Sequence, residues 1–253
     1  MAKSINFDRV SDIYDFYVNL DFDISFFLNE TKNTQEEILE LMCGTGRVSI
    51  PLLEAGRKLI CVDYSKGMLD IFAKKAEKFK DFVQLVEMDI TKLNLGKKFK
   101  TIILPFHSFS EITSSEKQFE ALQNISSHLD KEGKFILTLQ NPVTRLKNAD
   151  GELRTLGEFN IDNERKIVLS SINKFNSEDK TVTGYQYYEI YSSSNKLIEK
   201  RKLDIKFKPI SDKEFRSMIE KLDLKIIATY GDYSYSEFNE ETSNFIIYNI
   251  TKD

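Results

Sequence analysis

The sequence predicts an α/β fold: a doubly wound, seven-stranded, mostly parallel sheet with a terminal antiparallel hairpin, together with a small antiparallel β appendage. Three observations support this prediction. Short apolar runs alternate with longer segments of helical periodicity from residue 38 to residue 150, as in βαβ units. Apolar and polar residues then alternate with period two. A helical segment followed by two strand-like runs completes the chain.

Five apolar runs are predicted to form the parallel strands of the main sheet. These runs cover residues 38–42, 59–62, 82–88, 101–105 and 135–139. Between them, a helix is expected at residues 48–55, and Ser65 is expected to cap a second helix. Thr113 and Glu116 have the spacing of a capping box for a third helix. These helices are expected to cover both faces of the sheet.

The chain after the fifth strand is predicted to contain an antiparallel meander of three strands. The strands cover residues 166–173, 183–192 and 200–207. In the last of them, Leu203, Ile205 and Phe207 share one face and charged residues share the other, so we expect an apolar partner to cover the first face. The two longest segments without periodicity, residues 141–156 and 231–242, are expected to be loops.

The C-terminal part is predicted to complete the main sheet. A second capping box, Ser211 with Glu214, indicates a helix, and the two strands that follow it are expected at residues 225–230 and 244–250. The chain is therefore predicted to have three parts. They are a Rossmann-like core with an N-terminal helical lid at residues 1–145, an antiparallel insertion at 146–210, and a helix with the closing hairpin at 211–253.

Composition narrows the classes of partner that fit this fold. The 253 residues carry a net charge of −4 with interleaved signs, which argues against nucleic acid as a partner. The two cysteines and two histidines lack the spacing of a disulfide framework or a zinc site. No run approaches the ~20 apolar residues that cross a membrane. We therefore predict a cytoplasmic monomer or homodimer without a metal site or a membrane partner.

The most specific feature is an apolar strand that leads directly into a Gly-x-Gly turn, at Gly44 and Gly46, and then into a helix. Glycines can take positive φ and expose N–H groups, and the helix N-terminus adds partial positive charge. Asp63 follows the next predicted strand, where a carboxylate can accept both hydroxyls of a ribose. This pairing is typical of sites for adenosine cofactors, although a lone Gly-x-Gly turn also occurs without a ligand.

Motifs that are absent from the sequence narrow the choice among adenosine cofactors. A nicotinamide cofactor would use the same architecture, but Ser49 stands at the third glycine of its fingerprint. The sequence also lacks a P-loop and a Gly-x-Ser-x-Gly elbow. S-adenosylmethionine remains the cofactor that fits the pattern.

These motifs resemble those of the class I S-adenosylmethionine-dependent methyltransferases, in particular the small-molecule type with an antiparallel sheet inserted after the fifth strand. The resemblance extends over roughly residues 14–141 and rests on three runs. The runs are Glu40-Leu41-Met42-Cys43-Gly44-Thr45-Gly46-Arg47, Cys61-Val62-Asp63-Tyr64-Ser65 with Met68-Leu69, and Glu87-Met88-Asp89. In this chain Met42 stands where the family has its first glycine.

The resemblance implies roles for the matching residues. Glu40, Gly44 and Gly46 would hold the methionine moiety. Asp63 would bind the ribose hydroxyls and Asp89 the adenine amino group. The other residues that we assign to the cofactor site are Tyr14, Tyr17, Cys43, Arg47, Tyr64, Met68, Ile90 and Pro105.

Two pairs among these residues also have an ordinary structural interpretation. Tyr64 and Met68 would enclose the adenine ring, and Tyr14 and Tyr17 look like the N-terminal lid of small-molecule methyltransferases. Each pair fits simple core packing equally well.

His107 and Glu111 are the candidate catalytic residues, because they follow the fourth strand at the sheet edge where ligands bind. His107 can accept a proton near neutral pH, and Glu111 can orient an amine. Alternatively, His107 is a hydrogen-bonded loop residue and Glu111 is solvated.

The predicted function is methyl transfer to a small polar acceptor, with N-methylation preferred by resemblance. The meander is similar in placement to the extra sheet of sugar-nucleotide N,N-dimethyltransferases and glycine N-methyltransferases. Tyrosines of the meander and of the last loop would line an acceptor pocket or a dimer seam, or would pack within the sheets. The alternatives are an O-methyltransferase or a tRNA or protein methyltransferase and, from other classes, an NAD-dependent oxidoreductase or a noncatalytic ligand-binding protein.

Overall fold

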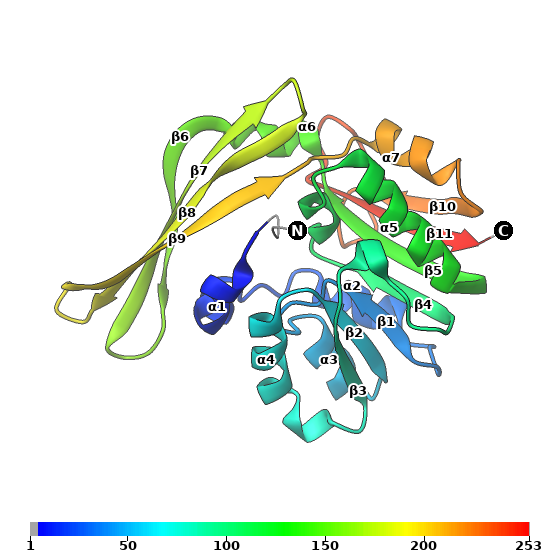
Figure 1. Ribbon diagram of the computed structural model, residues 1–253, viewed down its shortest axis with the longest axis horizontal. Coiled ribbons are helices and arrows are strands. Elements are labelled where there is room, and N and C mark those ends of the chain that lie inside the picture. The colour runs from blue at the N-terminus through cyan, green and yellow to red at the C-terminus, as the bar shows by residue number, and fades with distance from the viewer. Residues whose placement is uncertain (1–4, 253) are drawn as a thin grey trace.

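The computed structural model describes residues 5–252, which form two β-sheets that lie side by side (Figure 1). Within these residues the larger sheet has seven strands, in the order β10-β11-β5-β4-β1-β2-β3. The strands are β1 (Ile38–Leu41), β2 (Leu59–Asp63), β3 (Val83–Glu87), β4 (Phe99–Leu104), β5 (Leu129–Gln140), β10 (Leu224–Tyr230) and β11 (Phe245–Lys252). β1 to β5 are parallel, and β11 runs antiparallel to β5 and β10. The predicted fold class is confirmed.

Helices cover both faces of the larger sheet. One face carries α2 (Ile24–Glu30), α3 (Ser49–Glu54) and α4 (Lys66–Lys75), and the other carries α5 (Ser115–His128) and α7 (Asp212–Ile219). In β1, Ile38 packs in the cluster that contains Phe72 of α4, whereas Leu39 packs in the cluster that contains Leu122 of α5. Burial on both sides explains why the parallel strands are continuous apolar runs.

The smaller sheet is antiparallel and has the order β6-β7-β8-β9. Its strands are β6 (Asp150–Asn160), β7 (Arg165–Asn176), β8 (Thr181–Ser192) and β9 (Leu197–Phe207). The N-terminal elements η1 (Phe7–Arg9) and α1 (Ser11–Tyr17) lie between the two sheets (Figure 1). Val10 and Ile13 pack with Leu203 and Ile205 of β9, so the expected apolar partner of that strand face is the N-terminal segment.

The expectation of a three-stranded meander is wrong, because the smaller sheet has a further strand, β6, in a segment partly expected to be a loop. The same segment also contains the short helix α6 (Pro142–Arg145). Every residue of β6 is exposed or half-buried, and its pairing with β7 shifts register twice. Such an edge strand has no buried face, and therefore no apolar alternation that a sequence pattern could reveal.

The two predicted capping boxes had different outcomes. Ser211 and Glu214 cap α7 reciprocally: the Glu214 N–H donates to Ser211 Oγ at 3.3 Å, and the Ser211 N–H donates to Glu214 Oε2 at 3.1 Å. The box at Thr113 is wrong, because Ser114 is the N-cap of α5 and accepts from the Lys117 N–H at 3.4 Å. Thr113 and Ser114 are adjacent hydroxyl residues, and either can serve as an N-cap, so the sequence did not distinguish them.

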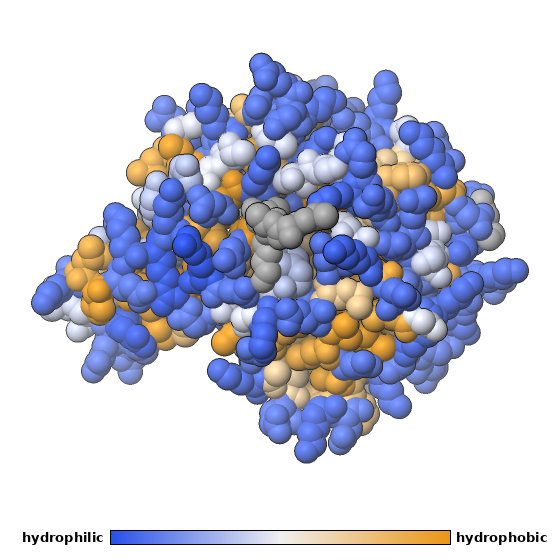
Figure 2. Space-filling model, viewed as in Figure 1, coloured by the Kyte–Doolittle hydropathy of each residue, from blue (hydrophilic) through white to orange (hydrophobic). Residues whose placement is uncertain are grey.

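The remaining elements are short 3₁₀ helices, namely η2 (Glu77–Phe79), η3 (Ile90–Lys92), η4 (Ser108–Glu111) and η5 (Leu146–Asn148). The face of the molecule in Figure 2 is largely hydrophilic, with apolar patches over both sheets. Within residues 5–252, every helix is too short or too polar to cross a bilayer. We propose that the chain divides near residues 145 and 210, because β6 to β9 fall between them.

Candidate active site

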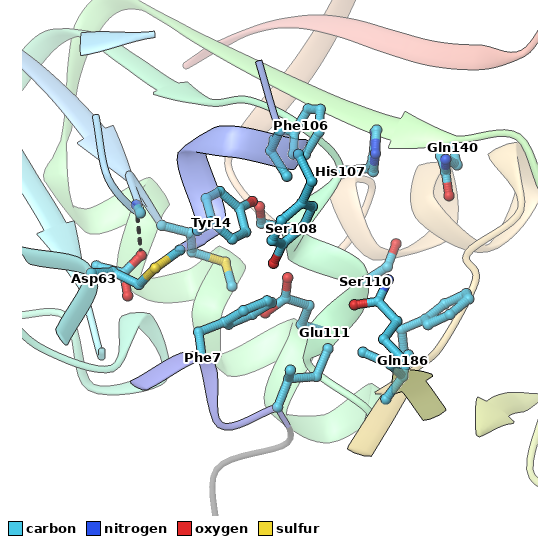
Figure 3. A pocket seen from close by; sticks show the side chains of 18 of the residues that line it. Phe7, Tyr14, Asp63, Phe106, His107, Ser108, Ser110, Glu111, Gln140 and Gln186 are labelled. Carbon is cyan, nitrogen blue, oxygen red and sulfur yellow. Dashed lines mark hydrogen bonds between the residues drawn. The ribbon is translucent and has the colours of Figure 1, made fainter. Parts of the chain in front are cut away.

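A cavity of about 460 Å³ lies between the larger sheet, the N-terminal segment and the smaller sheet (Figure 3). Its walls come from the turn after β1, the end of β2, the loop after β4 and the end of β5, and α1 and β6 to β9 add further residues. β1 pairs with β2 on one side and with β4 on the other, so the chain changes direction at this point of the sheet. Ligands of open α/β sheets bind at such a point. The volume also lies within the ~300–1,000 Å³ of small-molecule sites.

The turn after β1 presents its backbone to this cavity. Met42 and Gly44 have φ angles of 55° and 56°, so Met42 adopts the conformation that glycine adopts most readily. The Gly44 N–H donates to Asp63 Oδ2 at 2.8 Å, and the Ser65 N–H donates to Asp63 Oδ1 at 2.8 Å. Asp63 is only 7% exposed. A carboxylate has about four acceptor sites, so Asp63 can also accept from ribose hydroxyls.

Gly46 has a packing explanation that the sequence did not reveal. A Cβ built on Gly46 would lie 2.5 Å from the ring of Phe72 in α4, whereas a Cβ on Gly44 would meet the end of Met68 at 3.6 Å. Met68 and Gly44 line the main cavity, whereas Gly46 does not. The contact of Gly46 with the methionine moiety therefore stays a prediction.

A smaller cavity of about 40 Å³ adjoins the first and shares Tyr14, Gly44 and Phe106 with it. Four more residues of the predicted cofactor site line it, namely Glu40, Cys43, Arg47 and Pro105. Ser49 Oγ donates to Glu40 Oε2 at 2.6 Å, yet burial raises the pKa of Glu40 to about 8. A ligand ammonium beside this carboxyl would favour its ionised form.

Arg47 already has a partner within the protein. Its guanidinium donates to both oxygens of the buried Asp23, at 2.5 and 2.6 Å, and to the Leu20 carbonyl at 2.8 Å. It also lies 4.5 Å from the centre of the Phe106 ring. Arg47 therefore connects the turn after β1 to Leu20 and Asp23, which lie between α1 and α2. Its contact with the cofactor stays a prediction.

The N-terminal segment closes the cavity with aromatic side chains. The rings of Tyr14 and Tyr17 are 5.3 Å apart, and Tyr17 lies 5.1 Å from Tyr188 of β8, with the two hydroxyl oxygens separated by 3.1 Å. The Tyr64 hydroxyl donates to the Ile5 carbonyl at 2.7 Å. Tyr14, Tyr17 and Tyr64 all line the cavity. These contacts join the cavity wall at β2 to the N-terminal segment, and that segment to the smaller sheet.

Asp89 and Ile90 are not brought to this cavity. Asp89 is exposed and caps η3, where its Oδ1 accepts from the Thr91 N–H and hydroxyl, both at 2.9 Å. Ile90 is 4% exposed and belongs to the core beneath the sheet. The adenine contact of Asp89 therefore stays a prediction.

His107 lies in a strained loop after β4. Phe106 and His107 have φ angles of 59° and 52°, which cost non-glycine residues of order 1–3 kcal/mol each and are frequent at functional sites. The imidazole stacks between Phe106 and Phe245, with centroids 4.8 and 5.9 Å away. Its buried Nδ1 has no hydrogen-bond partner among residues 5–252. Burial, reinforced by Arg145 and Arg47, lowers the pKa of His107 to about 3. The expectation that His107 accepts a proton near neutral pH is therefore revised.

Glu111 ends η4 and points toward the middle of the cavity in Figure 3. Burial raises the pKa of Glu111 to about 8; the nearby Asp63 adds to this rise, and a hydrogen bond with Tyr64 opposes it. Glu111 is half-buried on the cavity wall, which argues against the alternative of a fully solvated carboxylate. With this pKa, the carboxyl of Glu111 ionises near the upper end of the physiological pH range, and its role as a proton acceptor stays a prediction.

The cavity also contains residues that were not predicted from the sequence, at the end of β5, in α6 and on the smaller sheet. Gln140 and Arg145 come from the end of β5 and from α6, and Gln186 comes from β8. The alternation of β8 places Gln186 and Tyr188 on the inner face, whereas Tyr185 is 38% exposed. The sequence did contain one indication of these residues, because Arg145 lies shortly after the predicted fifth strand, at the edge of the sheet where ligands bind.

The loop tyrosines pack away from the main cavity. Tyr233 is 9% exposed and lies 5.4 Å from Phe22, 5.6 Å from Phe26 and 5.2 Å from Phe245, between ring centroids. The suggestion that this loop lines the acceptor pocket is therefore replaced by ordinary packing against α2 and its neighbours.

Part of the chain is similar in sequence to known methyltransferases. Residues 38–133 match the family model described as a methyltransferase domain. The cypemycin N-terminal methyltransferase of Streptomyces sp. is 30% identical over 133 residues, which are 53% of each protein. The glycine/sarcosine N-methyltransferase of Halorhodospira halochloris is 28% identical over 53% of this chain and 51% of its own length. The chain thus spans about half the length of these curated relatives.

The fold extends the likeness to nearly the whole chain. An S-adenosylmethionine-dependent methyltransferase from Clostridium acetobutylicum superimposes with a TM-score of 0.80, covering 97% of this chain and 98% of that one at 18% identity. At this identity the likeness shows the fold alone. The family model thus matches residues 38–133, and the fold around them is similar to that of solved S-adenosylmethionine-dependent methyltransferases. The comparison supports the methyltransferase class and the S-adenosylmethionine cofactor expected from the sequence and disfavours the oxidoreductase alternative, while the activity of the whole chain stays a prediction.

Proposed function

We propose that the whole protein is an S-adenosylmethionine-dependent methyltransferase that acts on a small polar acceptor, with nitrogen preferred over oxygen. The observation that carries this proposal is the continuity of the main cavity. Gly44 and Asp63 line one side of it, and Glu111 lies toward its middle (Figure 3). A cofactor and a small acceptor bound there would share one enclosure.

The residues present fit the cofactor. Glu40 and Asp63 place two buried carboxyl groups on either side of Gly44, one suited to an ammonium and the other to ribose hydroxyls. Tyr64 and Met68 add apolar surface on the wall where an adenine ring would lie. When bound, S-adenosylmethionine would supply the methyl group: the acceptor atom would bond to the methyl carbon as the bond from that carbon to sulfur breaks, and S-adenosylhomocysteine would leave.

The chain's own contribution is position and proton acceptance. The aromatic side chains of α1 close the cavity, which restricts water and holds two small molecules in proximity. Glu111, once ionised, accepts the proton that an ammonium must lose before its nitrogen lone pair can react. The neutral imidazole of His107 gives the loop a polar, uncharged surface.

Nitrogen is preferred for two reasons. An amine needs only its neutral form, which a group with a pKa near 8 can help to generate, whereas an alcohol requires a much stronger base. The two curated relatives above also carry N-methyltransferase or N-terminal methyltransferase in their names. The alternative O-methyl, tRNA or protein acceptors are less consistent with a closed cavity of this size.

Other parts of the proposal rest on composition. The net charge of −4 supports a partner other than nucleic acid. A cytoplasmic location and a monomeric or homodimeric state remain proposals that size-exclusion and localisation measurements can test.

Transfer of tritiated methyl groups tests the proposed reaction. We expect the protein to label members of a panel of small amines, to leave matched alcohols nearly unlabelled, and to lose activity in Asp63→Ala. Labelling of alcohols alone would show that oxygen, not nitrogen, is the preferred methyl acceptor. Binding of S-adenosylhomocysteine with no labelling of amines, alcohols, peptides or tRNA would favour the noncatalytic alternative, and tighter binding of NAD would revive the oxidoreductase.

A further inference from the structure

Arg145 lies on the cavity wall at the side of β5, away from the predicted cofactor residues. It ends α6, which directly follows β5, the last strand of the parallel series, and is the third element after η4, where Glu111 lies. Three strand-to-strand steps separate β2, which carries Asp63, from β5. At a spacing of ~4.8 Å per step, Arg145 follows a strand roughly 14 Å from the one that ends in Asp63.

Within residues 5–252, the half-buried guanidinium of Arg145 has no anionic partner. Its contact is the face of the Phe207 ring, whose centre lies 4.7 Å from the guanidinium carbon. Among residues 5–252, no oxygen accepts a hydrogen bond from this side chain, whereas Arg47, on the neighbouring wall, has both oxygens of Asp23. Burial accordingly lowers the pKa of Arg145. Desolvation of a cation without a counter-charge is costly unless a ligand supplies that charge.

Two amide side chains share the same end of the cavity. Gln140 and Gln186 lie on the opposite side of the cavity from Asp63 (Figure 3). The Gln186 Oε1 accepts from the Tyr188 hydroxyl at 2.7 Å, which leaves the Gln186 N–H groups as its donors toward the cavity. Together with the guanidinium, these amides make an end of the cavity that is rich in hydrogen-bond donors.

We propose that Arg145, with Gln140 and Gln186, binds a carboxylate on the methyl acceptor, so that the acceptor is an amine that also carries a carboxylate. This inference rests on the proposed function and specifies its substrate class. Such a molecule has two charges that match the cavity: its ammonium faces Glu111 and its carboxylate faces Arg145. A fork of guanidinium N–H groups fits the two oxygens of a carboxylate.

The charge of the cavity favours a carboxylate over a phosphorylated acceptor. In the part of the chain that the structure describes, the cationic side chains on the two cavity walls are those of Arg47 and Arg145, and Arg47 is already paired with Asp23. One remaining positive charge balances a single carboxylate. A phosphate or diphosphate would bring further negative charge close to Asp63 and Glu111.

Binding of small zwitterions tests this inference without knowledge of the natural acceptor. The probes are glycine, β-alanine and 4-aminobutanoate, each paired with its carboxamide, with aminoethyl phosphate as the phosphorylated arm. Each probe is titrated into the complex of the protein with S-adenosylhomocysteine and followed by ligand-observed NMR. We expect at least one carboxylate to bind tenfold or more tightly than its amide and than aminoethyl phosphate.

Arg145→Met should weaken binding of that carboxylate at least tenfold, leave its amide within threefold, and leave the affinity for S-adenosylhomocysteine unchanged. Arg154→Met is the matched control, because Arg154 is exposed and paired with Asp150, and we expect it to change nothing. The inference is overturned if no carboxylate exceeds its amide, if aminoethyl phosphate binds best, or if Arg145→Met leaves carboxylate binding intact. Failure of S-adenosylhomocysteine to bind would instead overturn the proposed function itself.

Discussion

The carboxyl ends of β1 and β2 differ from those of β4 and β5 in how their polar groups are satisfied. At β1 and β2, Asp63 accepts from the backbone of its own motif, Glu40 accepts from Ser49, and Arg47 pairs with Asp23. At β4 and β5, in the described residues, the imidazole Nδ1 of His107 lacks a partner and Arg145 meets only an aromatic ring.

This difference indicates two kinds of site. Groups that are already hydrogen-bonded hold their positions before a ligand arrives, which suits a cofactor that every turnover uses. Groups that lack partners carry a desolvation cost that a ligand of matching charge removes, which makes them selective for that ligand. We therefore propose that the first region binds the cofactor and the second binds the acceptor.

The largest effect is expected from the acceptor region, in Glu111→Gln. Loss of the Glu111 carboxylate should lower kcat with an amine acceptor by about 100-fold, which is the lower end of general acid–base effects. The pKa of Glu111 is raised to about 8, so its carboxyl is mostly protonated at pH 7 and ionises as the pH rises. In the wild type, kcat/KM should therefore increase between pH 7 and 9. Steady-state kinetics should show a smaller increase in Glu111→Gln, because the variant lacks the carboxyl that ionises in this range.

Glu164→Gln serves as the control for this prediction, because Glu164 is exposed in the hairpin between β6 and β7. A Glu111→Gln enzyme with wild-type kcat and an unchanged pH profile would remove Glu111 from the reaction and weaken the contrast between the two regions.

The next effect concerns stability in the cofactor region. Gly46→Ala should lower the free energy of unfolding by about 2 kcal/mol, because the new methyl would overlap the Phe72 ring and the backbone has φ of 82°. Gly56→Ala is a matched control, since its φ is 77° but nothing lies within 4 Å of the built Cβ; about 1 kcal/mol is expected there. Urea denaturation measures both. Equal losses would show that backbone strain alone determines the glycine at position 46.

A smaller effect distinguishes the roles of Glu40 and Glu111, the two carboxyl groups whose pKa is raised to about 8. The ammonium of S-adenosylhomocysteine beside Glu40 would favour the ionised carboxyl, so binding releases a proton at pH 6 to 7. Affinity should then rise with pH by up to tenfold per unit in this range, where the ligand amine stays protonated. Calorimetric titrations should lose this dependence in Glu40→Gln and keep it in Glu111→Gln. The reverse pattern would exchange the assignments of the two regions.

The sequence predicted the first region better than the second for a physical reason. Gly44, Asp63 and Glu40 lie in or beside two strand ends, and their partners are within the same motifs, so spacing along the chain reports their geometry. The parallel strands were also visible, because burial on both faces makes each an apolar run.

The second region depends on contacts that spacing does not report. Arg145 follows a strand that was predicted, but its role emerges only when β9 brings Phe207 to it and leaves it without a carboxylate. β6 was missed because an exposed edge strand has no apolar face. The low pKa of His107 follows from burial and from two arginines far apart in the sequence, which no local pattern encodes.

The central claim, that Gly44 and Asp63 form the cofactor end of the cavity, is tested most directly by calorimetric titration of S-adenosylhomocysteine into the wild type, Asp63→Ala and Glu87→Ala. Glu87 is exposed at the end of the neighbouring strand and serves as the control. We predict that Asp63→Ala weakens binding at least tenfold, ~1.4 kcal/mol, while Glu87→Ala matches the wild type. A folded Asp63→Ala protein, shown by an unchanged circular dichroism spectrum, that binds as tightly as the wild type would contradict the claim.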